Sequence, residues 1–384
     1  MKINWITGHF YPETGGVEKH VEQIARMLIT KGHEVVVHAS AITVNNKKLP
    51  LIGELGEIRI QRYKPKFNLS FYFSMLKPDL KEGDIVVMEG YPSLTNDHIR
   101  KKYQTRFPLV VFIQGAVMPF GGLASFMKRI YDSVYGVKTL KTVDRIIAMT
   151  ELEKNWCMEK GIDGSKIEII PNGIPEEAFF EYDPQISKKK YNLKRYVLFI
   201  GRMYQDKAPS HLVSALSKLH DDFEDLGIIF VGPDQGEVAK IKTQAKQFGL
   251  ENRIIYAGKV SDTEKYELLS GCEFFALPSK FEAQGIVFLE AWAQKKAVIG
   301  TEVGGVPYVV KDRVRGLLYE YGDIDALAGH IRYLLENPAE SKRLGERGFR
   351  HVDSECRWEN VVVRIERLYL DSIEDFGKTK KTGS

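Results

Sequence analysis

The residues with the clearest chemical potential are two glutamates, Glu282 and Glu290, which are separated by seven residues. Gly285 lies between them, and the apolar run that follows it is expected to form a helix. A carboxylate accepts hydrogen bonds from pairs of sugar hydroxyls, and the free amides at a helix start can hold phosphate. The spacing therefore predicts a site that binds the two ends of a nucleotide sugar, its hexose and its ribose. The alternative, a pair of surface glutamates, suits Glu290 poorly because residues 287–289 are apolar.

Two cations follow the end of an expected strand a short distance upstream. The segment Phe199–Arg202 ends in Gly201 and Arg202, and Lys207 follows five residues later. Glycine opens space at the strand end, the guanidinium is a planar fork for two phosphate oxygens, and the ammonium is a compact point charge. This combination suits a diphosphate better than a single carboxylate. Taken alone, the two side chains are equally consistent with a solvated surface loop.

A third candidate is the loop Tyr11–Gly16, which lies between the first expected strand and the first expected helix. Its adjacent glycines, Gly15 and Gly16, allow a ligand to approach the backbone closely. The helix that follows presents free N–H groups and the positive end of its dipole. The alternative is a plain tight turn.

Composition excludes several other classes of protein. Hydrophobic residues make up 43% of the 384 residues and charged residues 28%, as in ordinary soluble domains. The three cysteines are far apart, which argues against a disulfide framework and a zinc site. No P-loop motif, no acidic DxD pair at a strand end and no long apolar segment occurs. We expect a cytoplasmic protein without a signal peptide. The net charge of +4 gives no indication of nucleic acid binding, although residues 1–175 are basic, with about 24 Lys and Arg against about 18 Asp and Glu.

Short β-branched runs alternate with amphipathic stretches, which predicts parallel sheets covered by helices. The expected strands form two series, and each series predicts a doubly wound, Rossmann-like domain. The first comprises residues 2–7, 34–39, 58–63, 84–89, 109–114, 145–149 and 167–170, and the second 196–200, 227–231, 253–257, 273–277 and 297–300. We expect an N-terminal domain over 1–175, a connection over 176–195, a C-terminal domain over 196–357, a final helix over 358–376 that packs back toward the N-terminal domain, and a disordered tail over 377–384.

The order and spacing of these motifs resemble glycosyltransferase family 4, the retaining enzymes of GT-B architecture. The resemblance extends over nearly the whole chain. It is carried by Gly15-Gly16, Lys31–Val35, Pro171–Ile174, Gly201-Arg202 with Lys207, the Glu282/Glu290 pair, Gly304–Pro307 and Gly316–Leu318. The resemblance implies two Rossmann-like domains that face each other across a cleft, with the donor held mainly by the C-terminal one.

The resemblance also implies a role for each matching residue. Arg202 and Lys207 would bind the donor diphosphate and stabilise the charge that grows on the leaving nucleotide. Glu282 would hold hydroxyls of the donor sugar, and Glu290 those of the ribose. Such enzymes work without a cofactor or a bound metal, because cationic side chains take the place of the metal.

Backbone groups would complete the donor site. Gly16 would approach the phosphates or the acceptor from the N-terminal domain, and Gly201 would open space for the diphosphate. The amides of four consecutive residues would contact sugar or phosphate: Gln284, Gly285, Ile286 and Val287.

Three residues depart from the family pattern. Gln114 occupies the place, after the fifth strand of the N-terminal domain, where a histidine commonly contacts the donor sugar. A glutamine still forms hydrogen bonds with a hydroxyl but cannot become cationic, which puts a direct transfer of mechanism in question. Ala208 stands where a glycine is usual, and Gln284 replaces a residue that is often aromatic, which bears on donor choice.

The stretch Gly121–Lys141 combines an apolar stripe at helical spacing with several cations. This pattern is compatible with a surface that rests on an anionic membrane, and such a surface would favour a lipid-linked or glycan acceptor at the inner membrane face. The alternative is an ordinary core-facing helix with a basic edge. The apolar residues are Phe126, Met127, Ile130, Tyr131, Val134, Tyr135 and Val137, and the cations are Lys128, Arg129, Lys138 and Lys141.

Two other functions fit the same architecture. A nucleotide-sugar epimerase would need additional catalytic carboxylates and histidines, and Gln114 removes one of the latter. A catalytically inactive subunit would bind the nucleotide sugar and stabilise another transferase. The nucleotide base, the sugar, the acceptor and the oligomeric state do not follow from the sequence.

Overall fold

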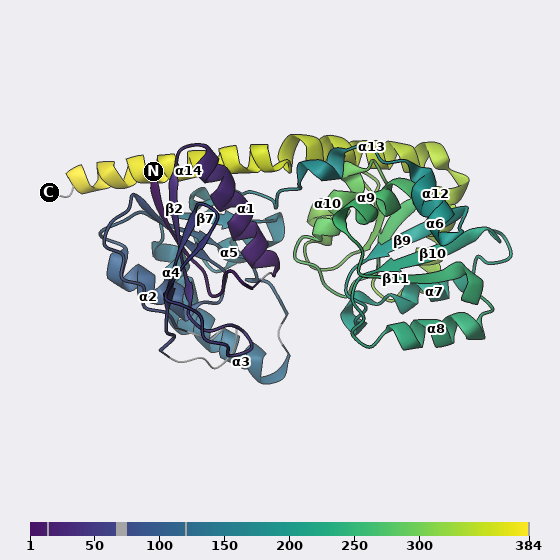
Figure 1. Cartoon of the computed structure of the whole chain (residues 1–384), viewed down its shortest axis with the longest axis horizontal. Helices are drawn as coiled ribbons and strands as arrows, with labels where there is room; N and C mark the ends of the chain where they lie inside the picture. Colours follow the sequence, from purple (N-terminus) through teal and green to yellow (C-terminus); the bar gives the residue numbers. More distant parts are fainter. Residues whose placement is uncertain (14, 67–74, 120, 383–384) are drawn as a thin grey trace. The chain divides into compact units, whose positions relative to one another are not determined.

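The computed structural model describes residues 1–13, 15–66, 75–119 and 121–382, which form two compact units (Figure 1). Unit 1 comprises Met1–Asn172 together with the segment that begins at Trp358, and unit 2 comprises Gly173–Arg357. Each unit has one mainly parallel sheet with helices on both faces, so the predicted pair of Rossmann-like domains is confirmed.

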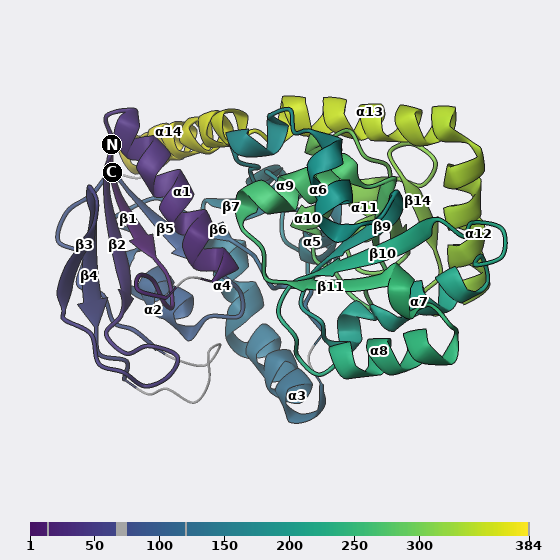
Figure 2. The ribbon, with the colours of Figure 1, turned by 45° about the vertical axis from the view of Figure 1, so that its right-hand side comes forward.

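The sheet of unit 1 has eight strands in the order β3-β4-β2-β1-β5-β6-β7-β8, all parallel except β3, which pairs with β4 in an antiparallel hairpin at the edge (Figure 2). Its central strands are buried on both faces, as the Val- and Ile-rich runs predict. The strands are β1 (Lys2–Ile6), β2 (Glu34–Ser40), β3 (Ile52–Leu55), β4 (Ile58–Tyr63), β5 (Ile85–Glu89), β6 (Leu109–Phe112), β7 (Arg145–Ala148) and β8 (Ile167–Ile169).

The helices of unit 1 cover two separate hydrophobic cores, one on each face of its sheet. On one face, Trp5 stacks on Phe112 and meets the edge of Tyr369, so the final helix packs beside the first. The other core lies under the helices between β5 and β8. The helices are α1 (Gly16–Thr30), α2 (Leu94–Tyr103), α3 (Gly122–Tyr131), the π-helical turn η1 (Asp132–Gly136), α4 (Val137–Thr142), α5 (Glu151–Glu159), the 3₁₀ turn η2 (Gly164–Lys166) and α14 (Trp358–Thr382).

The sheet of unit 2 has six parallel strands in the order β11-β10-β9-β12-β13-β14. They are β9 (Arg195–Ile200), β10 (Leu226–Val231), β11 (Ile254–Gly258), β12 (Phe274–Leu277), β13 (Val298–Thr301) and β14 (Leu317–Tyr319). The helical segments are η3 (Glu176–Phe179), α6 (Pro184–Tyr191), η4 (Gln205–Lys207), α7 (Ser210–Ser217), α8 (Val238–Gln247), η5 (Glu251–Arg253), α9 (Asp262–Gly271), α10 (Ile286–Ala293), α11 (Val306–Val310), α12 (Ile324–Glu336) and α13 (Pro338–Glu355).

Besides the short strands β3 and β14, which were not expected, two longer segments differ from the sequence-based expectation. Residues 176–195, expected to be a connection, contain η3 and α6 and belong to unit 2. Helix α6 forms because Asp183 caps the amide of Gln185, Pro184 starts the first turn, and Asn192 ends the helix in a left-handed conformation. The tail expected to be disordered from residue 377 continues α14 through Thr382. Residues 383 and 384 lie outside the described part of the chain.

Each sheet reverses its strand order once, and each switch point positions the candidate site residues of its own unit. In unit 1 the order reverses between β1 and β5, and in unit 2 between β9 and β12. In open parallel sheets, loops on the two sides of such a point leave in opposite directions, so a crevice opens beyond the carboxyl ends of the strands. Every predicted site residue follows one of these four strands, lies at the start of the helix after it, or follows the neighbouring β6.

Candidate functional site

In unit 2 the loop after β9 has space for a ligand at Gly201 and Arg202. The amide of Gly201 donates to the carbonyl of Val231 at 2.9 Å, which holds the strand end in place. A Cβ at Gly232 would lie 1.9 Å from the Gly201 carbonyl oxygen, so the two loops approach as closely as glycine allows. Arg202 is exposed, lies over the ring of Tyr204 at 5.7 Å, and has no acidic partner in the described part of the chain. Its guanidinium is available to an anion.

The structure brings two predicted catalytic residues, Lys207 and Glu282, into direct contact. The Lys207 ammonium forms an ion pair with Oε1 of Glu282, and the Ser279 hydroxyl donates to the same oxygen at 2.8 Å. Both partners are largely shielded from solvent, with exposed side-chain fractions of 20% and 13%. The loop that follows β12 is thereby attached to the loop that follows β9, next to the switch point of the sheet.

Ala208, the residue that replaces the usual glycine, has a left-handed backbone conformation with φ of 44°. This conformation costs an L-residue about 1–2 kcal/mol. The turn keeps it because the Ala208 amide donates to the carbonyl of Gln205 at 3.0 Å and the side chain is buried.

Helix α10 begins directly after the Glu282 loop and points its free amides toward it. Gly285 caps the helix in the left-handed region at φ of 75°, Gln284 is buried before it, and Ile286 is exposed. The amide of Gly305 donates to the Glu282 carbonyl at 2.8 Å, and a Cβ at Gly305 would lie 1.8 Å from the carbonyl oxygen of Ala283. The Gly304–Pro307 motif therefore fixes the backbone of the loop that carries Glu282.

Glu290, the predicted ribose ligand, is buried on α10 and paired with a lysine that the sequence did not single out. Its Oε1 lies 2.7 Å from the Lys265 ammonium, which also contacts Asp262 at 3.0 Å. Burial lowers the pKa of Lys265, but the charge of Glu290 and the hydrogen bonds it accepts outweigh this and raise the pKa above its ordinary value. Lys265 is therefore charged at neutral pH and keeps the Glu290 carboxylate in one orientation.

Unit 1 contains a pocket of about 230 Å³ at its own switch point. It opens beyond the carboxyl ends of β1, β5 and β6 and is bordered by the first turn of α1. Two predicted site features are here: Gln114 lies in its wall, and Gly16 begins the bordering helix. The lining residues are Thr7, Gly8, His9, Val17, Glu18, Glu89, Gly90, Tyr91, Pro92, Ser93, Gln114, Gly115 and Met118.

Gly16 has no internal packing reason to be a glycine. It is the first residue of α1 and is exposed, and a Cβ built on it would meet no atom within 4 Å. At Gly15 a Cβ would approach only Oε2 of Glu18, the end of a flexible side chain. The space at Gly16 is thus open to a ligand.

Two polar side chains of the pocket have buried atoms without a partner, Oε1 of Glu89 and Nε2 of Gln114. The other Glu89 oxygen accepts the indole N–H of Trp5 at 3.2 Å. Complete burial, with a smaller effect from the Glu18 carboxylate, raises the pKa of Glu89 well above its usual range and so favours the protonated carboxyl. His9 is neutral, because burial lowers its pKa more than Glu18 and Glu13 raise it.

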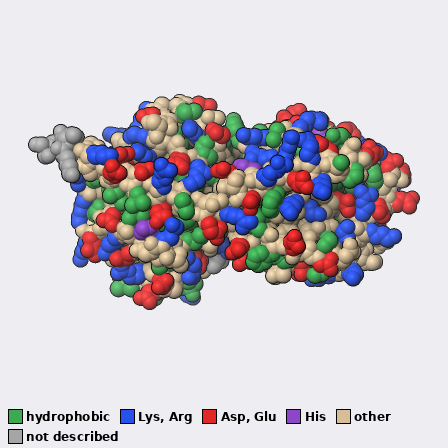
Figure 3. Space-filling view, turned by 90° about the horizontal axis from the view of Figure 1, so that it is seen from above, with side chains coloured by type: hydrophobic (Ala, Val, Ile, Leu, Met, Phe, Trp, Pro, Cys, Tyr) green, Lys and Arg blue, Asp and Glu red, His purple; other side chains and the backbone are tan. Residues whose placement is uncertain are grey.

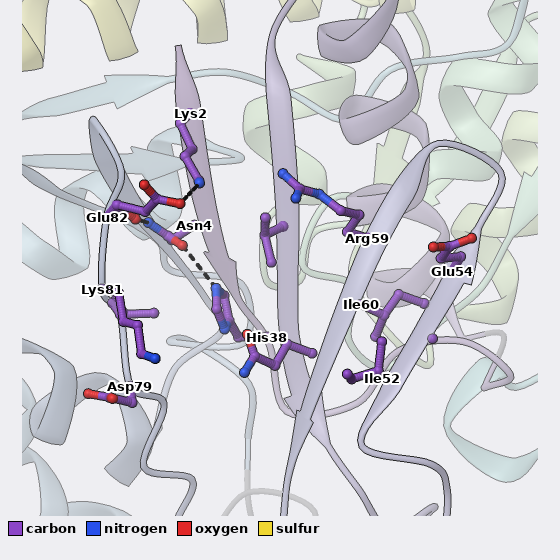
Figure 4. A pocket seen from close by; sticks show the side chains of 14 residues that line it. Lys2, Asn4, His38, Ile52, Glu54, Arg59, Ile60, Asp79, Lys81 and Glu82 are labelled. Atoms are coloured by element: carbon purple, nitrogen blue, oxygen red, sulfur yellow. Dashed lines mark hydrogen bonds and ion pairs between the residues drawn. The ribbon is translucent and has the colours of Figure 1, made fainter.

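A second pocket of unit 1, about 350 Å³ in volume, contains none of the predicted site residues (Figure 4). The buried polar side chains at its floor form hydrogen bonds with other groups of the protein. His38 contacts the Asn4 carbonyl oxygen and the Tyr63 hydroxyl at 3.0 Å each, and the Asn4 amide donates to the Glu82 carbonyl at 2.9 Å. The Lys2 ammonium at its rim is paired with Glu82. We assign no role to this pocket.

Sequence reasoning missed Glu18, Glu89 and Lys265. Glu89 ends a buried strand, which was a usable signal, but its indole partner comes from a different strand. Lys265 lies 25 residues before Glu290, and no spacing rule connects them. In the described ranges no three His, Cys, Asp or Glu side chains are grouped to hold a metal ion, and no helix is long and apolar enough to cross a membrane. Metal independence stays a prediction.

Comparisons with known proteins identify relatives of both halves of the chain. The family described as Glycosyltransferase Family 4 matches residues 14–178, and the one described as Glycosyl transferases group 1 matches residues 183–351. N-acetyl-alpha-D-glucosaminyl L-malate synthase of Bacillus anthracis is 26% identical, over 95% of this chain and 96% of that protein. Phosphatidyl-myo-inositol mannosyltransferase of Mycobacterium leprae is 27% identical, over 96% of each.

Solved structures have the same fold. Sucrose-phosphate synthase of Thermosynechococcus elongatus aligns with a TM-score of 0.75 at 19% identity, covering 96% of this chain and 98% of that one. Anabaena HepE in complex with UDP and glucose aligns with a TM-score of 0.70 at 18% identity, with the same coverage. The family matches, the two Rossmann-like units and the order of the motifs agree, and the chain belongs to glycosyltransferase family 4, with the GT-B fold.

Proposed function

We propose that this protein transfers a hexose-type sugar from a nucleotide-diphosphate sugar to a hydroxyl group of a glycan or a lipid-linked acceptor. The observation that carries the proposal is the ion pair of Lys207 with Glu282 beside the unpaired Arg202, at the switch point of unit 2. A cation for phosphate and a carboxylate for hydroxyls lie together there, next to the free amides of α10. Relatives named for sugar transfer, and HepE structures titled with UDP and UDP-glucose, support the donor class.

The proposed roles follow from charge and geometry. Arg202 binds two oxygens of the diphosphate, and Lys207 neutralises the charge that develops as the bond between sugar and phosphate breaks. Glu282 binds hydroxyls of the donor sugar, while Glu290, oriented by Lys265, binds those of the ribose. Because Lys207 and Glu282 already hold each other in place, little reorganisation is needed when the donor binds.

We propose further that transfer retains the anomeric configuration and needs no metal. In a front-face reaction the acceptor hydroxyl attacks on the side that the phosphate leaves, so no nucleophilic carboxylate is required. The leaving phosphate takes the proton of the acceptor hydroxyl. The two cationic side chains do the work that a divalent ion would otherwise do.

The surface of α3 and η1 favours a lipid-linked acceptor at the inner face of a membrane. Phe126, Ile130 and Val134, spaced four residues apart, are 60%, 48% and 52% exposed. Tyr131 faces the core instead and donates to the Ser93 carbonyl at 2.9 Å. Lys128 also turns inward to Asp132, whereas Arg129 stays exposed beside the apolar side chains. The segment thus presents both an apolar stripe and a cation to the outside.

The proposed function is tested by replacing Glu282 with alanine and measuring sugar transfer. We expect transfer to fall by at least about 100-fold while the nucleoside diphosphate alone still binds, because the lost contacts are to the sugar. Full transfer by this variant would contradict the site assignment. Arg202→Ala is the complementary variant and should weaken binding of the nucleoside diphosphate itself.

An analysis of the reaction products distinguishes the two alternative functions, an epimerase and an inactive subunit, from a transferase. An epimerase would convert the nucleotide sugar without an acceptor and release no nucleoside diphosphate. An inactive subunit would bind the donor without turnover, and Gln114, which cannot become cationic, would then be the first residue to replace by histidine.

A further inference from the structure

The pocket of unit 1 has a polar floor whose purpose internal packing does not explain. Glu89 ends β5 and Gln114 follows the adjacent strand β6, and both contribute to the same pocket. Oε1 of Glu89 and Nε2 of Gln114 are buried and have no hydrogen-bond partner. Buried polar atoms in native proteins are nearly always paired, so two orphans in one cavity indicate a ligand that completes them.

A structural role for Glu89 accounts for only one of its oxygens. Oε2 accepts the indole N–H of Trp5, which anchors the side chain among the apolar residues of the core. A glutamine or a serine would serve a lone indole donor without burying an ionisable group. The second oxygen, Oε1, has no partner within the protein, and Glu89 is one of the residues that line the pocket.

The charges around the pocket select the kind of ligand. Its lining contains no lysine or arginine among the described residues, and it contains the carboxylate of Glu18. Burial lowers the pKa of His9 and raises that of Glu89, so both shifts favour the uncharged forms of these side chains. A phosphate or a carboxylate would find no cationic side chain in this lining, whereas an uncharged ring with several hydroxyls would find donors and acceptors.

We propose that Glu89 is a specificity-determining residue, and that its unpartnered oxygen, together with the amide of Gln114, binds hydroxyl groups of an uncharged sugar ring. This inference rests on the proposed function, which it extends by naming the chemistry of the group that occupies unit 1. With Oε2 engaged by Trp5, the carboxyl proton is on Oε1 and is donated to a sugar oxygen. The ring is either the sugar of the donor or a sugar of the acceptor.

The test compares Glu89→Leu, Glu89→Gln and the wild-type chain in two arms, a calorimetric titration with donors and an NMR experiment with acceptor sugars. The donor arm measures the affinity for each of UDP-glucose, GDP-mannose and ADP-glucose relative to the matching nucleoside diphosphate. The acceptor arm follows saturation transfer from the protein to methyl glycosides of glucose, mannose and N-acetylglucosamine. Glu153→Gln is the matched control, because Glu153 is also a buried glutamate of unit 1 but accepts the Met149 amide outside the pocket.

We expect Glu89→Leu to lower sugar binding in one arm by about tenfold, the loss expected for one hydrogen bond to a buried group. Glu89→Gln keeps a neutral donor of the same shape and should stay within about threefold of the wild type, as should the control. The arm that responds identifies the source of the sugar. Circular dichroism on each variant verifies folding, and Glu89→Gln remains informative if Glu89→Leu does not fold.

Two outcomes contradict the inference in distinguishable ways. If the wild-type chain binds nucleotide sugars but a folded Glu89→Leu matches it in both arms, the role of Glu89 is wrong and the proposed function stands. If Glu89→Leu does not fold and Glu89→Gln loses sugar binding by tenfold or more, the neutral-donor role is likewise wrong. If the wild-type chain binds no nucleotide sugar and no glycoside, the proposed function is wrong, and the inference, which rests on it, is wrong as well.

Discussion

Gly16 is the residue whose conservative replacement separates function from stability most cleanly. Because a Cβ there meets no atom within 4 Å, Gly16→Ala should leave the free energy of unfolding unchanged or raise it by up to about 1 kcal/mol. The same methyl group would occupy the space that a ligand needs, so kcat/KM for transfer should fall by at least about tenfold. The measurement pairs urea unfolding with steady-state kinetics.

The matched control for Gly16 is Gly329, which is exposed within α12 and also has nothing within 4 Å of a built Cβ. Gly329→Ala should gain stability through helix propensity and keep full activity. Equal activity in both variants would exclude a close approach of the ligand at Gly16.

The buried carboxyl of Glu89 predicts a pH-dependent stability. Its pKa is raised well above the ordinary value by burial and by the Glu18 charge. Above pH 4.5 the unfolded chain loses this proton while the folded chain keeps it, so stability falls as pH rises toward the folded-state pKa. Relative to Glu89→Gln, the wild type should lose up to about 1.4 kcal/mol per pH unit.

Urea unfolding at pH 5, 6, 7 and 8 measures this difference. Glu153, whose pKa burial raises to about 7, is present in both proteins and cancels from the comparison. In the described part of the chain, Glu89 interacts electrostatically with two other ionisable groups, Glu18 and the buried Tyr369. A constant difference across the series would mean that Glu89 is ionised in the folded chain.

At the residue scale, the places of the candidate residues of unit 2 were easier to predict from the sequence than those of unit 1. Gly201, Arg202 and Lys207 lie within seven residues, and Glu282–Glu290 is one contiguous segment, so spacing alone placed them at strand ends. Glu89 differs because its role in the pocket depends on contacts with Trp5 and on the nearby Gln114, which belong to or follow other strands. No local pattern predicts that a carboxyl will be buried without a counter-charge.

At the scale of elements, the buried parallel strands were predictable and the peripheral ones were not. Runs such as residues 85–88 are continuous β-branched and apolar segments, which a strand buried on both faces requires. The edge strand β3 was missed because it has only four residues and none of them is buried. β14 was missed because three residues are too short to show a period.

The segment of α3 and η1 makes a prediction of its own, that its outer stripe binds an anionic membrane. Replacing Phe126 and Ile130 with serine together should lower binding to vesicles containing phosphatidylserine by about tenfold or more, since each apolar side chain contributes about 1.5–3 kcal/mol on burial. Vesicle flotation measures the bound fraction. Salt should weaken the remaining binding.

The matched control uses two exposed apolar residues of α14, Val363 and Leu370, which are 52% and 49% exposed. Their double replacement with serine should leave vesicle binding unchanged. If both double variants bind like the wild type, the α3 stripe does not contact lipid. Figure 3 shows the molecule from the side of α13 and α14, where Lys and Arg side chains lie among Asp and Glu.

At the scale of the whole molecule, the alternation of strands and helices predicted two Rossmann-like domains because each domain is built from repeated β-strand–α-helix units. The boundary was less predictable. A run of charge over residues 176–195 suggested a connection, yet its caps at Asp183 and Asn192 make it a helix of unit 2. A run of charged residues indicates exposure to solvent. A linker and a surface helix are both exposed, so charge alone does not distinguish them.

The central claim, a metal-independent nucleotide-sugar site in unit 2, is tested most directly by thermal unfolding with UDP, GDP, ADP and their sugar conjugates in EDTA. Ligand at 100 times its Kd stabilises the folded state by about 2.7 kcal/mol, which corresponds to a rise in Tm of about 5–10 °C for a domain of this size. The account predicts such a rise with one nucleotide series, and its loss in Arg202→Ala. No rise with any series, with or without added magnesium, would contradict it.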